Sequence, residues 1–156
     1  MSASGTVAGG DNTSLTVLMI VNNQDRSRDF YHHVMGADIV RERDPAILRF
    51  YNGVIVLNTG GGPTSDKPTV TMAPPADPDT VSMALNIRVA DIQAVYHAWR
   101  SRGARFLTPP QDRDRDIRCH LRDPDGYLFE VGRTTPCLDP PRRGASLSRL
   151  ARRQGC

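Results

Sequence analysis

The chain has 156 residues, of which 38% are hydrophobic and 24% are charged. This composition is ordinary for a folded domain and excludes collagen-like and low-complexity chains. No apolar run reaches the roughly 20 residues that span a bilayer, and the N-terminus lacks the basic and apolar regions of a signal peptide. We therefore expect a cytoplasmic protein with no membrane partner.

Three cysteines are present, Cys119, Cys137 and Cys156. Their number is odd and their spacing matches neither a CxxC motif nor a zinc finger, so free thiols are expected rather than a disulfide framework.

The net charge of +3 comes from the C-terminus. After Asp139 there is no acidic residue but there are five arginines, and without them 15 basic residues face 17 acidic ones. The body of the protein is therefore mildly acidic. We predict that residues 134–156 form a basic, disordered tail and that nucleic acid is an unlikely partner, because only this tail would attract it.

The first half of the chain predicts one βαβββ unit over residues 14–58. An apolar, β-rich run is followed by Asn22 and Asn23, either of which can cap a helix, and Gly36 is placed to end that helix. Asn52-Gly53 predicts a tight hairpin turn. The expected elements are a strand at 15–21, a helix at 24–35, and strands at 37–42, 47–51 and 54–58.

The second half repeats this order over residues 81–133. Asp91 is a good helix cap, Gly103 ends the helix, and Asp125-Gly126 predicts the last hairpin turn. The expected elements are a strand at 82–89, a helix at 92–102, and strands at 104–108, 117–122 and 127–131.

These repeats predict an α+β fold of two tandem βαβββ modules. Residues 59–80 are rich in Gly, Pro, Asp and Thr and are interpreted as a linker, and residues 1–13 as a flexible N-terminus. Each unit is too small to bury its own sheet face, so we expect the two modules to form a curved mixed sheet around a cleft.

Two stretches resemble the vicinal-oxygen-chelate superfamily, which includes glyoxalase, bleomycin-resistance and extradiol-dioxygenase proteins. They are residues 27–40 (SRDFYHHVMGADIV) and residues 118–132 (RCHLRDPDGYLFEVG). The resemblance covers roughly residues 14–133. It implies cups lined by β-strands and, in catalytic members, a divalent metal held by His and Glu side chains from the first and last strand of each module.

Carried onto this chain, the family's four ligand positions fall on Thr16, Val56, Ala84 and Glu130. Only Glu130 keeps a ligand side chain, and a shift by one residue brings no further ligand into place. One carboxylate with a threonine hydroxyl cannot hold a catalytic transition metal against water. We therefore predict no metal and no other cofactor.

Strand alternation suggests what lines the cup, because side chains two residues apart share a face. Leu18, Ile20 and Leu128 would make it mostly apolar. Its polar candidates are Arg49, Tyr51, Asn86, Arg88, Arg118, His120 and Glu130. A second interpretation is that Glu130 and Arg88 form only a buried ion pair that fixes the sheet. Arg118 and His120 would join the cup only if their strand turns these side chains inward.

Two classes of function remain. The first, which the lost ligands favour, is a homodimer or a two-module monomer that binds a small organic, hydrophobic or aromatic molecule in a metal-free cup, for sequestration of an antibiotic or metabolite. A homodimer is expected, but the sequence leaves open whether the modules pair within one chain or across the dimer. The second is an enzyme, a lyase, isomerase or epimerase, with Glu130 and His120 as catalytic acid and base. Lactoylglutathione lyase or dioxygenase activity needs the metal and is disfavoured.

Overall fold

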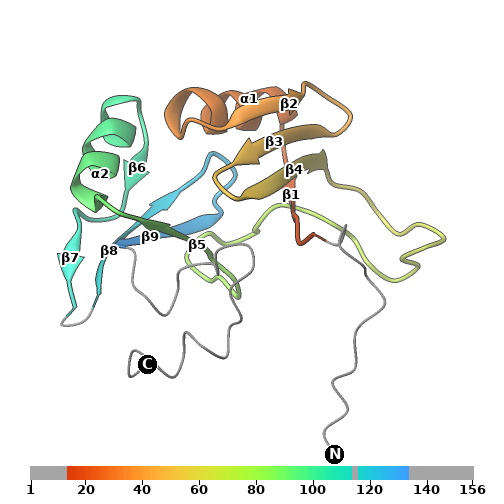
Figure 1. Ribbon diagram of the computed structural model, residues 1–156. Helices are drawn as coiled ribbons and strands as arrows, with labels where there is room; N and C mark the ends of the chain where they lie inside the picture. Colours follow the sequence, from red (N-terminus) through yellow and green to blue (C-terminus); the bar gives the residue numbers. More distant parts are fainter. Residues whose placement is uncertain (1–13, 114–115, 134–156) are drawn as a thin grey trace, which may run out of the picture.

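The computed structural model describes residues 14–113 and 116–133 (Figure 1). The predicted N-terminus at residues 1–13 and the basic tail at residues 134–156 lie outside the described residues. No helix in the described part of the chain is long and apolar enough to cross a membrane.

The first module is a four-stranded mixed sheet with strand order β1-β4-β3-β2. Its helix begins after Asn23, whose side chain accepts a hydrogen bond from the backbone N–H of Arg26 at 2.9 Å. Gly36, at φ 83°, follows the helix in the left-handed conformation expected of a C-terminal glycine. The elements are β1 (Val17–Val21), α1 (Gln24–Asp29), the π-helical turn η2 (Phe30–Val34), β2 (Asp38–Arg41), β3 (Ala46–Phe50) and β4 (Gly53–Thr59).

The second module repeats this plan in a sheet of strand order β5-β9-β8-β6, with β7 paired to β8. Asp91 caps its helix by accepting from the N–H of Ala94 at 2.9 Å. The elements are β5 (Leu85–Val89), α2 (Ile92–Ser101), β6 (Arg105–Phe106), β7 (Gln111–Asp112), β8 (Ile117–Arg122) and β9 (Leu128–Arg133). The predicted α+β fold of paired βαβββ modules is thus confirmed.

The turn between β3 and β4 differs from the prediction. Phe50 pairs with Gly53, so the two turn residues are Tyr51 and Asn52 rather than Asn52 and Gly53. Tyr51 adopts φ 51°, a left-handed conformation that costs a non-glycine residue about 1–2 kcal/mol. The Asn-Gly pair suggested the turn, but the sheet register places it one residue earlier.

The two modules pack through their helix-covered sheet faces. Tyr31 of η2 contacts Phe129 of β9, with ring centroids 5.9 Å apart, and Phe50 of β3 lies 6.2 Å from Trp99 of α2. These residues belong to one hydrophobic core that both modules share. The outer faces of the two sheets therefore point away from the interface between the modules.

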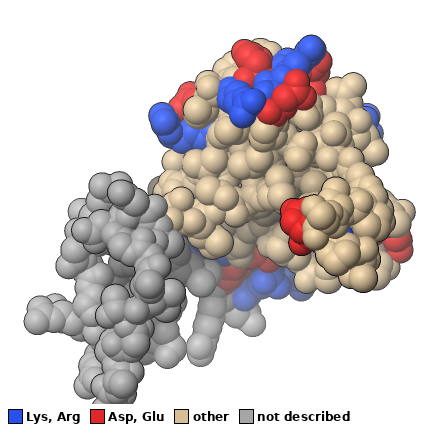
Figure 2. All heavy atoms as spheres, turned by 90° about the vertical axis from the view of Figure 1, so that its right-hand side faces the viewer, with Lys and Arg blue, Asp and Glu red and all other residues tan. Residues whose placement is uncertain are grey.

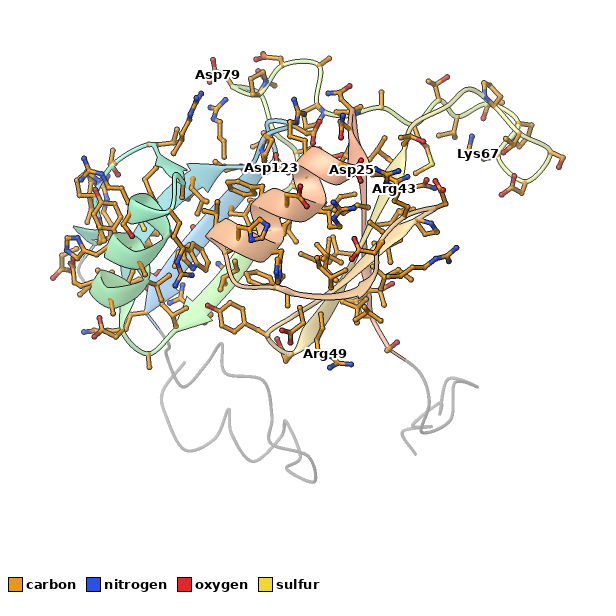
Figure 3. All side chains as sticks on the ribbon, turned by 90° about the horizontal axis from the view of Figure 1, so that it is seen from above. Asp25, Arg43, Arg49, Lys67, Asp79 and Asp123 are labelled. Atoms are coloured by element: carbon orange, nitrogen blue, oxygen red, sulfur yellow. The ribbon has the colours of Figure 1, made fainter. Side chains whose placement is uncertain are left out.

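Two buried carboxylates of the β8–β9 turn, Asp123 and Asp125, hold the modules together, and Figure 3 labels the first of them. Asp125 accepts hydrogen bonds from the backbone and side chain of Asn22, from Arg26 and from Ser27, at 2.5–2.9 Å. Asp123 accepts from the Tyr31 hydroxyl at 2.5 Å, and burial raises the pKa of both groups. The Asp-Pro-Asp-Gly turn thus ties the second module to the helix of the first.

The segment between the modules has defined structure of its own. A bridge between Gly61 and Met72 closes a projecting loop, and the ammonium of Lys67 donates to the carbonyl of Gly62 within it (Figures 1 and 3). Farther along, Asp79 forms an ion pair with Arg122 of β8 at 2.6 Å. The segment is therefore attached to the second module before β5 begins.

Candidate functional site

The candidate site is centred on Glu130, on the outer face of the second sheet. In the strand register Glu130 lies opposite His120 on β8 and opposite Asn86 on β5. Asn86 donates a hydrogen bond to Oε1 of Glu130 at 2.6 Å, and Nε2 of His120 lies 3.2 Å from Oε2. Cross-strand pairing thus places an amide and an imidazole on either side of one carboxylate.

Two arginines approach the same carboxylate without direct hydrogen bonds to it. Arg88 and Arg118 lie 3.7 and 3.6 Å from its oxygens. Arg88 is bound more closely to Asp116, at 2.6 and 3.2 Å, and donates to the carbonyl of Arg133 at 2.5 Å. The predicted ion pair between Glu130 and Arg88 is therefore the looser contact of this arginine, and Asp116 is its main partner.

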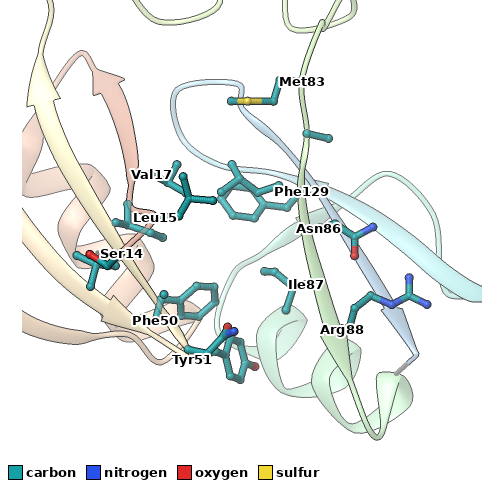
Figure 4. Close-up of a pocket in the computed structure, with 16 residues that line it drawn as sticks. Ser14, Leu15, Val17, Phe50, Tyr51, Met83, Asn86, Ile87, Arg88 and Phe129 are labelled. Atoms are coloured by element: carbon teal, nitrogen blue, oxygen red, sulfur yellow. The ribbon is translucent and has the colours of Figure 1, made fainter. Parts of the chain in front are cut away.

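The cluster is open to solvent on one side. The Glu130 side chain is 17% exposed, whereas the side chains of His120 and Arg118 are 32% and 43% exposed. Asn86 and Arg88 point away from the strands of the first module (Figure 4). A ligand would reach Glu130, His120 and Arg118 from outside the chain, whereas Asn86 and Arg88 also line the pocket between the modules.

The corresponding face of the first module is apolar. Leu18 and Ile47 lie on either side of Val56 in the sheet, and Leu18 is 50% exposed. Arg49, also exposed, lies on β3 opposite Val54. Much of the surface on this side of the molecule is uncharged (Figure 2).

Within one chain, the structure brings Asn86, Arg88, Arg118 and His120 around Glu130, but it does not add the candidates from the first module. Arg49 belongs to the other sheet, whose outer face points elsewhere, and Tyr51 lines a pocket between the modules. Ile20 is only 6% exposed, because the linker at Gly60 lies against its side chain. A single chain therefore does not bring Arg49 to the Glu130 cluster, whereas Tyr51, Asn86 and Arg88 line the cleft between the modules.

The donor set does not fit the metal that the family resemblance implies. Thr16, Val56 and Ala84 supply no charged or imidazole ligand, and two arginine cations lie within 3.7 Å of the remaining carboxylate. Among residues 14–113 and 116–133, no group of three or more His, Cys, Asp and Glu side chains could hold a metal ion.

Sequence reasoning missed two residues of the site, Asp116 and Gly132. Asp116 lies near the end of residues 111–118, where charges of opposite sign alternate, and it fixes the guanidinium of Arg88. Gly132 lies beneath the same guanidinium, where a Cβ atom would overlap it. Only the pairing of β5 with β9 places Gly132 opposite Arg88.

Two βαβββ modules with an Asp-Pro-Asp-Gly turn and a carboxylate on the last strand define a recognisable class of protein. The family model of the Glyoxalase/Bleomycin resistance protein/Dioxygenase superfamily matches residues 14–131. The chain belongs to this superfamily. No curated protein sequence matches it significantly.

Solved structures share the fold at low sequence identity. TioX from Micromonospora sp. ML1 is 19% identical, with a TM-score of 0.58 over 79% of this chain and 97% of that chain. TnmS3, an antibiotic binding protein from Streptomyces sp. CB03234, is 18% identical, with a TM-score of 0.57 over 80% and 98%. The fosfomycin resistance protein FosX from Mesorhizobium loti is 17% identical, with a TM-score of 0.57 over 80% and 93%.

Proposed function

We propose that this protein binds a small organic molecule without a metal, in a cup that two copies of the chain build together. The observation that carries the proposal is the separation of two complementary faces. The polar face around Glu130 and the apolar face around Val56 belong to one chain but point in different directions. A second copy would bring the apolar face of one chain over the polar face of the other.

The chemistry of these faces suits an organic ligand. Sites of this kind combine apolar walls with a few convergent polar groups, which fix the orientation of the ligand. Glu130 would accept a hydrogen bond or a positive charge, Arg118 would take an acidic group, and Leu18 and Val56 would cover an apolar body. The antibiotic-binding and fosfomycin-resistance proteins of the same fold support sequestration of an antibiotic or metabolite as the biological role.

The contact between His120 and Glu130 favours a second candidate, an enzyme working by acid and base catalysis. An imidazole 3.2 Å from a carboxylate is held in a fixed orientation by it and can accept or donate a proton. A lyase, isomerase or epimerase reaction on a ligand held over β8 and β9 would use this pair. Binding remains the main proposal, because it requires only the surfaces described above.

A thermal-shift screen against antibiotics and metabolites tests the proposal, since a specific ligand stabilises the folded protein by mass action. Each ligand is recovered after incubation and analysed by mass spectrometry. Glu130→Gln should weaken binding at least about tenfold, whereas Glu42→Gln, on the exposed edge near α1, should not.

Sedimentation should detect a dimer that Leu18→Arg disrupts together with ligand binding. A ligand recovered unchanged supports sequestration. If the wild type converts the ligand and Glu130→Gln does not, the protein is an enzyme and the sequestration proposal is wrong. Tight binding by a monomeric Leu18→Arg protein would show that the two-copy cup is wrong.

A further inference from the structure

We infer that the chain carries a second binding site, for an uncharged aromatic molecule, in the pocket between its two modules. This pocket has a volume of about 1100 Å³, slightly above the usual range for small-molecule sites. It lies on the helix-covered side of both sheets, opposite to the Glu130 cluster. The inference does not depend on the proposed function.

Strand alternation separates the two sites. On β5 and β9, Leu85, Ile87 and Phe129 line the pocket, whereas Glu130 does not, and Asn86 and Arg88 line it with their polar groups bound to Glu130 and Asp116. The same two strands therefore present an apolar wall to the pocket and a polar wall to the outer site. The two sites share Asn86 and Arg88, whereas Glu130, His120 and Arg118 belong to the outer site.

The walls of the pocket are aromatic and aliphatic. Phe50 and Val17 from the first module face Ile87 and Phe129 from the second (Figure 4). Of the described residues that line the pocket, only Arg88 is charged, and its guanidinium is bound to Asp116 on the outer face. An uncharged ligand fits this lining, because a charged group would lose its hydration without gaining a partner.

Tyr51 completes the pocket at its mouth. Its ring lies 4.6 Å from that of Phe50, and its backbone is held at φ 51°, which is disfavoured for a tyrosine. Two-residue hairpin turns require a positive φ at this position. Here the conformation keeps an aromatic ring beside an open apolar cavity.

Several large apolar side chains at the rim of the pocket are exposed to solvent. Leu15, Met83 and Tyr51 are 94%, 64% and 56% exposed. Exposed apolar side chains gathered at one place indicate a surface that becomes covered. Because they surround a concave space with walls from two sheets, a compact flat molecule fits better than an extended partner.

Fluorescence titration with N-phenyl-1-naphthylamine tests this inference, because this uncharged probe brightens in apolar surroundings. We expect saturable binding of one probe per chain. The matched probe 1-anilinonaphthalene-8-sulfonate has the same rings and one sulfonate, and should bind at least about tenfold more weakly. Leu85 and Ile87 line the pocket and are only partly buried, so a tryptophan at either position should fill it. Ile87→Trp and Leu85→Trp should each weaken probe binding at least about tenfold.

Two controls separate this site from the outer one. Leu18→Trp adds the same side chain on the opposite face of β1, and Glu130→Gln changes only the outer cluster, so both should leave probe binding unchanged. A loss of binding in these controls but not in Ile87→Trp and Leu85→Trp would overturn the inference, as would the absence of saturable binding.

Two further outcomes would also overturn it. If the probe binds only after removal of residues 1–13 or 134–156, the pocket holds a segment of the chain itself. If probe affinity falls as rising protein concentration drives association, a second copy covers the pocket. In either case the thermal-shift screen with Glu130→Gln remains a valid test of the proposed function, because Glu130 does not line the pocket.

Discussion

Nε2 of His120 lies 3.2 Å from Oε2 of Glu130, and the two residues are direct partners across the β8–β9 ladder. The Asp-Pro-Asp-Gly turn fixes this register, since it joins the two strands and is itself held by helix α1. The pair therefore combines a chemical contact with a rigid support, which suits either ligand binding or proton transfer.

His120→Ala should weaken binding of a ligand found in the screen by about tenfold, because one hydrogen-bonding group next to Glu130 is lost. Isothermal titration calorimetry measures the change, with His97→Ala on the exposed side of α2 as control. Equal affinity of His120→Ala and wild type would remove His120 from the binding site.

Asp125→Ala should lower the free energy of unfolding by about 3 kcal/mol or more. The Asp125 side chain is fully buried and accepts from three residues of the first module, which would lose their partner. Urea unfolding measures the effect. Asp79→Ala removes a carboxylate that is 84% exposed and should cost about 0.5 kcal/mol or less. Similar losses in the two variants would show that the turn does not hold the modules together.

Gly132→Ala should displace the guanidinium of Arg88 from β9 and loosen its contact with Asp116. We expect a destabilisation of about 1–3 kcal/mol, as for other overpacked sites. Thermal unfolding gives the loss, and a crystal structure of the variant would show the new position of Arg88. Gly62→Ala, which meets no atom within 4 Å, is the matched control. An unchanged melting temperature for Gly132→Ala would contradict the close approach of Arg88.

Cys119 should react slowly with thiol reagents in the folded protein. Burial raises the pKa of its thiol from 9.0 to about 11, which lowers the reactive thiolate at neutral pH by about 100-fold. In a Cys137→Ser/Cys156→Ser variant, Ellman's reagent should report this thiol only slowly until guanidinium chloride unfolds the chain. Rapid labelling under native conditions would show that Cys119 is accessible.

Zinc, nickel or manganese should leave the melting temperature unchanged, because the family's ligand positions offer one carboxylate flanked by arginines. Elemental analysis of the purified protein should find less than one metal ion per chain. A stoichiometric metal that is lost in Glu130→Gln would overturn the ligand mapping.

Local sequence signals determined most of the fold. Asn23, Asp91, Gly36 and Gly103 mark helix ends through their own side chains or backbone freedom, and these effects act within a few residues. The strand at residues 117–122 was predicted with its observed bounds. The repeated order of elements then sufficed for the α+β fold of two modules.

Tertiary structure decided which faces meet. Alternation shows that Glu130 and Asn86 share a face, but not whether that face meets the other module or solvent. The β8–β9 register turned His120 toward Glu130, and the β5–β9 pairing placed Arg88 over Gly132.

Because Tyr31 packs on Phe129, the outer faces of the two sheets point away from each other, and an aromatic pocket remains between the modules. These relationships join residues far apart in the chain. They depend on how two modules dock through a shared core, and no local pattern in the sequence encodes that choice.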